Sequence, residues 1–99
     1  MTFDQLLNAD YRFPTVGLFK QPRCPACEAL LPRLELWCKD HSVRLEIFMV
    51  SENVEAAKKL GLRTAPTVVV VHEGEAKIAF AGNPVGSLEP WLRAVGVKQ

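Results

Sequence analysis

Two cysteines separated by a Pro-Ala pair are the residues of this sequence best suited to chemistry. Cys24 and Cys27 lie three positions apart, and Pro25 between them suits the first position of a helix. The unpaired N–H groups and the positive dipole end of such a helix would stabilise a thiolate at Cys24. The pattern therefore predicts that Cys24 attacks a disulfide and that Cys27, one turn further on, resolves the mixed disulfide.

Zinc binding and burial as unreactive thiols are the two other interpretations of this pair. Zinc takes about four ligands in proteins, and the remaining candidates are Cys38, His41 and His72. Cys38 and His41 lie about four turns further along the predicted helix, roughly 20 Å from Cys24, and cannot share an ion with it. We therefore expect no metal and no organic cofactor, a buried thiol at Cys38, and both histidines at the surface.

Composition limits the classes of protein to which the chain can belong. Its 99 residues allow one domain, residues 1–99, and the 48% hydrophobic and 23% charged residues are typical of a globular protein. Twelve basic and eleven acidic residues are interspersed, so neither nucleic acid nor a membrane surface is an expected partner. We expect a monomer. The start of the chain lacks the pattern of a secretory signal, and a cytoplasmic location is predicted.

Local patterns predict the elements that must position the cysteines. In order, we expect a helix over 2–8, a buried strand over 15–20, a helix over 25–41, a strand over 43–50, a helix over 51–60, a strand over 67–71, its hairpin partner over 76–81, and a closing helix capped by Ser87. The later half of strand 43–50 is expected to be buried on both faces, and Pro32 to kink the long helix. Four residues of the closing helix are expected to face inward: Leu88, Trp91, Leu92 and Val95.

The order of these elements predicts an α/β fold. A parallel β-α-β unit followed by an antiparallel hairpin gives a mixed sheet of about four strands with helices on both faces, in the order (α)βαβαββα. With this order of elements and this cysteine pair, the chain resembles the thioredoxin superfamily over nearly its whole length. The features that carry the resemblance are Cys24-Pro-Ala-Cys27 after a buried strand, Pro32 five positions later, Gly61-Leu-Arg-Thr-Ala-Pro-Thr67, and Gly82 after the last strand.

The resemblance implies a thioredoxin fold and a thiol–disulfide oxidoreductase that acts on protein disulfides. It also implies that Pro66 is a cis-proline facing the cysteines, with Ala65 offering backbone groups to an extended substrate. Further expected substrate contacts are Arg23, Pro25, Ala26 and Gly82. A reductase of the type that serves thioredoxins is the expected electron donor.

Departures from the family pattern keep other interpretations open. Thioredoxins usually have tryptophan before the first cysteine and a buried aspartate in the first strand, where this chain has Arg23 and Leu18. Proton transfer to Cys27 would then use water or another group, for which Glu46 is a candidate.

Two alternative functions follow from the same residues. The Cys-Pro-x-Cys form is similar to glutaredoxins, and Lys20 and Arg23 could bind a glutathione carboxylate. Ala26 replaces the usual tyrosine of that family, however, and the Gly-Gly-Asp that holds glutathione is not visible around residues 82–84. A glutathione-dependent reductase stays open as the first alternative because of the Cys-Pro-x-Cys form and the two basic residues. A non-catalytic binding module that keeps the fold as a docking surface is the second.

Overall fold

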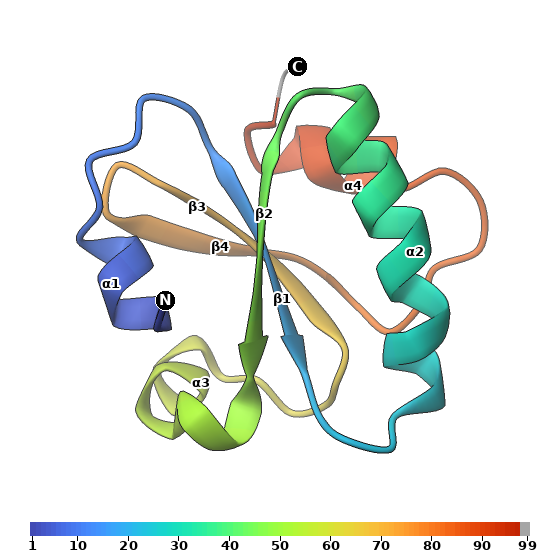
Figure 1. Ribbon diagram of the computed structural model, residues 1–99, viewed down its shortest axis with the longest axis horizontal. Coiled ribbons are helices and arrows are strands. Elements are labelled where there is room, and N and C mark those ends of the chain that lie inside the picture. The colour runs from blue at the N-terminus through green and yellow to red at the C-terminus, as the bar shows by residue number, and fades with distance from the viewer. Residues whose placement is uncertain (98–99) are drawn as a thin grey trace.

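Figure 1 shows the fold of the chain, a computed structural model that describes residues 1–97. In chain order the elements are α1 (Phe3–Leu7), β1 (Thr15–Lys20), α2 (Pro25–Asp40), β2 (Arg44–Met49), a 3₁₀ turn (Val50–Glu52), α3 (Val54–Leu60), β3 (Thr67–His72), β4 (Glu75–Ala81) and α4 (Glu89–Ala94). The order of helices and strands predicted from the sequence is confirmed. Within the described residues, no helix is both long and apolar enough to cross a bilayer.

The four strands form one mixed sheet in the order β2-β1-β3-β4. β1 pairs in parallel with β2 and antiparallel with β3, and β3 pairs antiparallel with β4. The central strands β1 and β3 are apolar on both faces because helices cover both faces of the sheet there. The expected burial of both faces in the later half of strand 43–50 is wrong. Ile47 is 42% exposed, because β2 lies at the edge of the sheet, where the covering is thinner.

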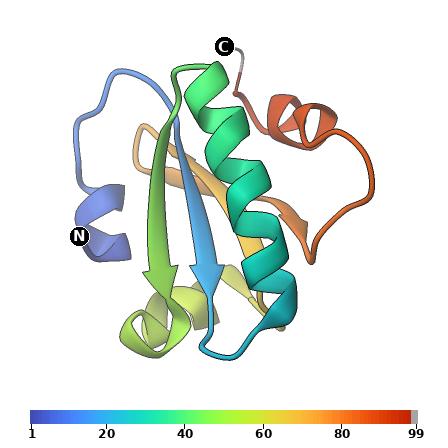
Figure 2. The ribbon, with the colours of Figure 1, turned by 45° about the vertical axis from the view of Figure 1, so that its right-hand side comes forward.

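Helices on opposite faces of the sheet make two separate hydrophobic cores. α2 and α4 cover one face, and their core includes Leu30, Leu34, Cys38, Leu92, Val16 and Leu18. α1 and α3 cover the other face, with Phe3, Leu6, Phe19, Phe48, Ala56 and Val69. Figure 2 shows the long helix α2 lying across the sheet beside α4, with α1 on the other side. The rigid sheet therefore holds the start of α2 at a fixed place relative to β3.

The break before α3 has a local cause. The helix predicted over 51–60 begins only at Val54, after the 3₁₀ turn. The Asn53 side chain donates to the Met49 carbonyl at 2.9 Å and accepts from the Phe3 N–H at 2.9 Å. An asparagine that binds the backbone in this way competes with helical hydrogen bonding, so the helix starts after it.

The closing helix α4 differs from the prediction in two respects. Leu88, and not the predicted Ser87, is the residue directly before the helix. The Ser87 hydroxyl still accepts a hydrogen bond of 3.1 Å from the N–H of Glu89, the first helical residue. Leu88 and Leu92, one turn apart, are buried, but Trp91 is 46% exposed. A helix of six residues turns only a narrow stripe toward the sheet, and Trp91 lies beside that stripe.

Two leucines of α2 test the importance of the core on the α2 face. Leu34 is fully buried and Leu36 is 61% exposed. Leu34→Ala should lower the free energy of unfolding by about 2–5 kcal/mol, because it leaves a cavity under the helix that carries the cysteines. Leu36→Ala, the matched control, should change it by less than about 0.5 kcal/mol. Urea unfolding followed by circular dichroism measures both, and equal effects would contradict the assignment of Leu34 to the core.

Candidate active site

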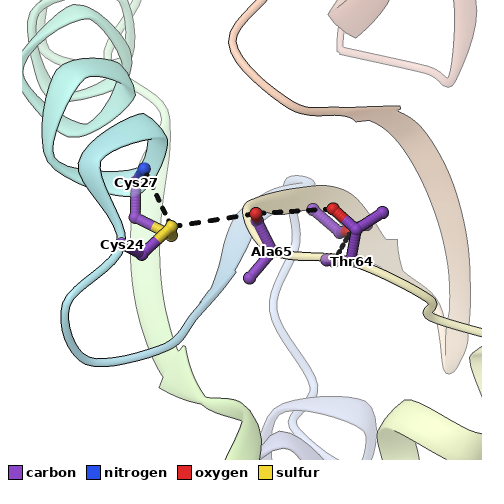
Figure 3. Close-up of a disulfide and its surroundings, with 5 residues drawn as sticks. Cys24, Cys27, Thr64 and Ala65 are labelled. Atoms are coloured by element: carbon purple, nitrogen blue, oxygen red, sulfur yellow. Dashed lines mark hydrogen bonds between the residues drawn. A yellow bond between two sulfur atoms is a disulfide. The ribbon is translucent and has the colours of Figure 1, made fainter.

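Cys24 and Cys27 lie where β1 passes into α2, beyond the carboxyl end of β1. Figure 1 shows this junction at the end of the sheet where β1 and β2 both finish. Cys24 directly precedes α2 with an extended backbone, φ −115° and ψ 97°, and α2 begins at Pro25. The Cys24 Sγ accepts a hydrogen bond of 3.2 Å from the Cys27 N–H. The two sulfurs lie at disulfide distance, with Cα atoms 5.2 Å apart (Figure 3). The predicted position of the pair at a helix start is confirmed.

The two sulfurs differ in accessibility. Cys24 is half-buried, whereas Cys27 is only 1% exposed. The amino end of a helix stabilises a negative charge by about 0.3–1 kcal/mol, and by up to about 2 kcal/mol in partly buried geometries. A thiolate at Cys24 would receive that stabilisation together with the Cys27 N–H. The arrangement therefore suits a first attack by Cys24 on a disulfide outside the protein and a second attack by Cys27 within it.

The loop before β3 faces the Cys24 sulfur from across the site (Figure 3). The Ala65 carbonyl oxygen lies 3.7 Å from the Cys24 Sγ, within reach of the thiol as donor. The same oxygen lies 3.4 Å from the Thr64 hydroxyl, and the Thr67 hydroxyl donates to the Thr64 carbonyl at 2.8 Å. The Ala65–Pro66 peptide bond is cis, and Pro66 is buried. The loop thus turns a backbone edge toward Cys24.

Gly82 lies beside this loop. Its N–H donates to the Pro66 carbonyl at 2.8 Å, just past the last pair of the β3–β4 ladder. Its φ of 79° is in the left-handed region, which glycine adopts without strain. The structure therefore brings Cys24, Ala65, Pro66 and Gly82 together, although they come from three different segments of the chain.

The remaining predicted contact residues lie on the rim of the site. Arg23 is exposed and has a φ of 55°, a turn conformation that directs the chain into α2. Pro25 is exposed and Ala26 is half-buried in the first turn of the helix, and Lys20 is half-buried at the end of β1. Among these, Arg23 brings a positive charge next to Cys24.

The interior behind the cysteines is apolar. Leu18 is fully buried in the core under α2. Glu46, the candidate proton carrier, lies on the face of the sheet that α1 and α3 cover, opposite the face that carries α2 and Cys27. Residues alternate along a strand, so Glu46 shares a face with Phe48 and the α1 and α3 core, whereas Leu45 packs on the α2 side. Glu46 is therefore not placed to exchange a proton with Cys27, and the proton carrier predicted from the sequence is wrong.

Arg33 is a residue of the site region that the sequence analysis missed. Its guanidinium donates from α2 to the Asn83 side-chain oxygen, the Pro84 carbonyl and the Gly86 carbonyl. No local pattern links Arg33 to a loop fifty residues away, so the sequence carried no signal for this contact. Pro32 beside it lies within α2, which continues to Asp40; the kink expected there stays a prediction.

Cys38 and the two histidines lie away from the cysteine pair. Cys38 is 2% exposed in the α2 core, as predicted, and burial raises the pKa of its thiol to about 12. His41, partly buried at the end of α2, stacks on Trp37 and contacts Glu89 at 3.1 Å through Nε2. His72 Nε2 lies 3.1 Å from the Arg12 carbonyl oxygen. Within residues 1–97, no three His, Cys, Asp or Glu side chains are grouped so that they could hold a metal ion.

The chain is similar in sequence to a curated protein named thioredoxin from Rickettsia bellii (strain RML369-C). The two are 29% identical over 92 residues, which cover 90% of this chain and 86% of the relative. No protein-family model matches the chain. The sequence likeness therefore rests on whole-chain similarity.

Solved structures share the fold. Thioredoxin of Fasciola hepatica matches with a TM-score of 0.77 at 24% identity, over 93% of this chain and 89% of that one. Thioredoxin of Trypanosoma brucei brucei matches with a TM-score of 0.75 at 21% identity, over 94% of this chain and 81% of that one. The predicted thioredoxin fold is confirmed.

Burial of Cys38 should make stability depend on pH in the alkaline range. Burial raises the pKa of this thiol from its ordinary 9.0 to about 12. Above pH 9 the unfolded chain therefore loses a proton that the folded chain keeps, and stability falls as pH rises toward 12. Between pH 8 and pH 10, Cys38 should lower the free energy of unfolding by about 1 kcal/mol.

Urea unfolding of the oxidised protein measures this effect, because Cys24 and Cys27 do not titrate in the disulfide form. The wild type should lose about 1 kcal/mol more than Cys38→Ala between the two pH values. An identical loss in both proteins would show that Cys38 does not carry the pH dependence.

Proposed function

We propose that this member of the thioredoxin superfamily is a thiol–disulfide oxidoreductase that reduces protein disulfides through Cys24 and Cys27. The observation that carries the proposal is the half-buried Cys24 sulfur, which accepts the Cys27 N–H at the start of α2 and faces the Ala65 carbonyl. The helix start and the Cys27 N–H favour the thiolate of this reachable sulfur, which is what attack on a disulfide requires, and the Ala65 carbonyl marks where a substrate backbone would lie.

The reaction consists of two exchanges at sulfur. The Cys24 thiolate attacks one sulfur of a substrate disulfide, forms a mixed disulfide, and releases the other substrate sulfur as a thiolate that takes up a proton. The Cys27 thiolate then attacks the Cys24 sulfur and releases the second substrate thiol. Two electrons pass to the substrate, and the protein is left with a Cys24–Cys27 disulfide. Burial of Cys27 supports this order, because it can reach Cys24 but not a substrate in solvent.

Substrate recognition is proposed for the segments around Cys24. Ala65 supplies backbone groups that an extended peptide can pair with, in the manner of an added strand. Pro66 and Gly82 hold that edge in place through the bond from the Gly82 N–H to the Pro66 carbonyl. Arg23, Pro25 and Ala26, which flank Cys24 in the chain, are the proposed side-chain contacts.

Protein disulfides and an electron donor are the proposed partners, and the protein is proposed to act as a monomer. A reductase of the type that serves thioredoxins is the first candidate for the donor, with glutathione as the alternative. A cytosolic location, predicted from the sequence, would suit the role because a reducing compartment keeps the pair as the dithiol.

An insulin-reduction assay with dithiothreitol tests the activity. The wild type should accelerate the precipitation of insulin chains, and Cys24→Ser should reduce the rate to that of dithiothreitol alone, because the attacking sulfur is lost. Reduced Cys27→Ser, freed of dithiothreitol and mixed with oxidised insulin, should accumulate a mixed disulfide between Cys24 and the substrate, visible by mass spectrometry, because neither Cys27 nor an added thiol is present to resolve it. Cys38→Ala is the matched control and should keep the wild-type rate. Equal acceleration by Cys24→Ser would rule out the proposed mechanism.

Recycling of the oxidised protein distinguishes the two donors. NADPH with thioredoxin reductase should restore the dithiol, whereas glutathione with glutathione reductase should do so much more slowly. The expectation rests on Ala26 and on the residues after Gly82, which lack the glutathione-binding pattern. NADPH oxidation in each coupled system measures the rates. Faster recycling by glutathione would assign the protein to the glutathione-dependent alternative.

A further inference from the structure

The end of α2 lies beside α4, and His41 joins the two helices (Figure 1). His41 directly follows α2, and its Nδ1 lies 2.8 Å from the Trp37 carbonyl oxygen, one turn earlier in the helix. Its Nε2 lies 3.1 Å from a carboxylate oxygen of Glu89, the first residue of α4. Both nitrogens of the ring therefore face oxygen atoms that accept hydrogen bonds and donate none.

The charged form of the His41 ring is the form that fits these two oxygens. A neutral imidazole has one N–H and one lone pair, so it donates to one oxygen while its lone pair faces the other. The imidazolium has two N–H groups and donates to both. Histidine is also the side chain whose charge ordinarily changes between about pH 5 and pH 8. The number of hydrogen bonds between the two helices therefore depends on pH.

Two further features of the contact favour a positive ring. The rings of His41 and Trp37 are stacked, with centroids 4.0 Å apart and an interplanar angle of 15°, and the face of an indole attracts a cation. The Trp37 carbonyl belongs to the last turn of α2 and also accepts the His41 backbone N–H at 3.1 Å. A cation at this end of a helix is stabilised by the helix dipole.

The carboxylate opposite the ring keeps its charge over the same pH range. Glu89 and Arg93 face His41 from α4, and the neighbours of His41 in the chain, Lys39 and Asp40, are exposed. Arg93 Nε lies 3.4 Å from the second carboxylate oxygen of Glu89. The hydrogen bond and charge of Arg93, followed by those of His41, lower the pKa of Glu89 from its ordinary 4.5, against a smaller opposing effect of desolvation. Of the His41–Glu89 pair, only the histidine changes charge above pH 5.

We propose that the His41–Glu89 contact is a pH-sensitive switch that holds α4 against the end of α2 more tightly when the ring is charged. α4 has six residues, too few to be stable as an isolated helix, so it depends on its contacts with the rest of the fold. Because the folded chain favours the charged ring, the added stability is present at acidic pH and is lost as pH rises and the ring loses its proton. This inference concerns the fold and does not depend on the proposed function.

Urea unfolding of the oxidised protein at pH 5.5 and pH 8 tests the switch. Glu89→Gln keeps the size of the side chain and removes its charge. It should raise the unfolding equilibrium constant about threefold more at pH 5.5 than at pH 8, the size expected for a partly exposed ion pair. The lost contact with Arg93 cancels in this comparison, because neither Arg93 nor Glu89 changes charge between the two pH values.

Histidine variants assign the difference to its residue. In the His41→Gln background, Glu89→Gln should raise the unfolding constant by the same factor at both pH values, because no titrating ring faces residue 89. His72→Gln is the matched control, since the other histidine lies at the end of β3, 3.7 Å from Glu73. In that background the threefold difference should remain.

The fluorescence of Trp37 reports the charge of the stacked ring. Trp91→Phe leaves Trp37 as the single tryptophan. Its emission should fall from pH 8 to pH 5.5, because a stacked imidazolium quenches indole fluorescence, and His41→Gln should remove this change.

Three outcomes would overturn the inference. The first is an effect of Glu89→Gln that is equal at the two pH values in the wild-type background. The second is a pH difference that persists in His41→Gln, and the third is a Trp37 emission that does not respond to His41. None of these measurements involves disulfide reduction, so the activity assays and the switch can fail independently.

Discussion

The hydrogen bond from the Cys27 N–H to the Cys24 sulfur exists because α2 begins at Pro25, and the rest of the site is arranged around that beginning. A helix has unpaired N–H groups only in its first turn, so moving the start by one residue would move the sulfur away from them. Pro25 favours a start at this position because its fixed φ suits the first helical residue and its missing N–H is not needed there. The chemistry of the site thus depends on where one helix starts.

That helix start is held in place by the packing of the sheet. The core beneath α2 contains Leu30, Leu34 and Cys38 against β1 and β3, and Leu18 lies fully buried in the same core. The chain leads from the end of β1 to Cys24, and β3, which pairs with β1, begins directly after Ala65 and Pro66. Because β1 and β3 are hydrogen-bonded neighbours, the same ladder fixes the Cys24 sulfur and the Ala65 carbonyl that face each other.

Hydrogen bonds hold the part of the site formed by the loops before β3 and after β4. The Gly82 N–H binds the Pro66 carbonyl, and Arg33 binds the residues that follow Gly82. These bonds satisfy backbone carbonyls of an exposed loop that has no strand partner. An apolar core thus orients the reactive sulfur, and a small set of hydrogen bonds shapes the surface around it.

The sequence by itself determined the local features of this protein. Capping of α1 by Thr2, the start of α2 at Pro25, and the burial of Cys38 on the same side of the helix as Cys27 all follow from residues within a few turns of one another. The resemblance to a known family supplied the expectation that Pro66 faces the cysteines, since spacing alone relates no two distant segments.

The tertiary structure decided the rest. The contact between Cys24 and Ala65 joins residues 41 positions apart, and Arg33 binds a loop 50 or more positions away. The exposure of Ile47 and the placement of Glu46 on the α1 and α3 face depend on strand order and on the pleat of a paired strand. The spacing of apolar residues indicates which side of a helix or strand is apolar, but not which other element packs against that side. Those contacts between elements form only when the whole sheet assembles.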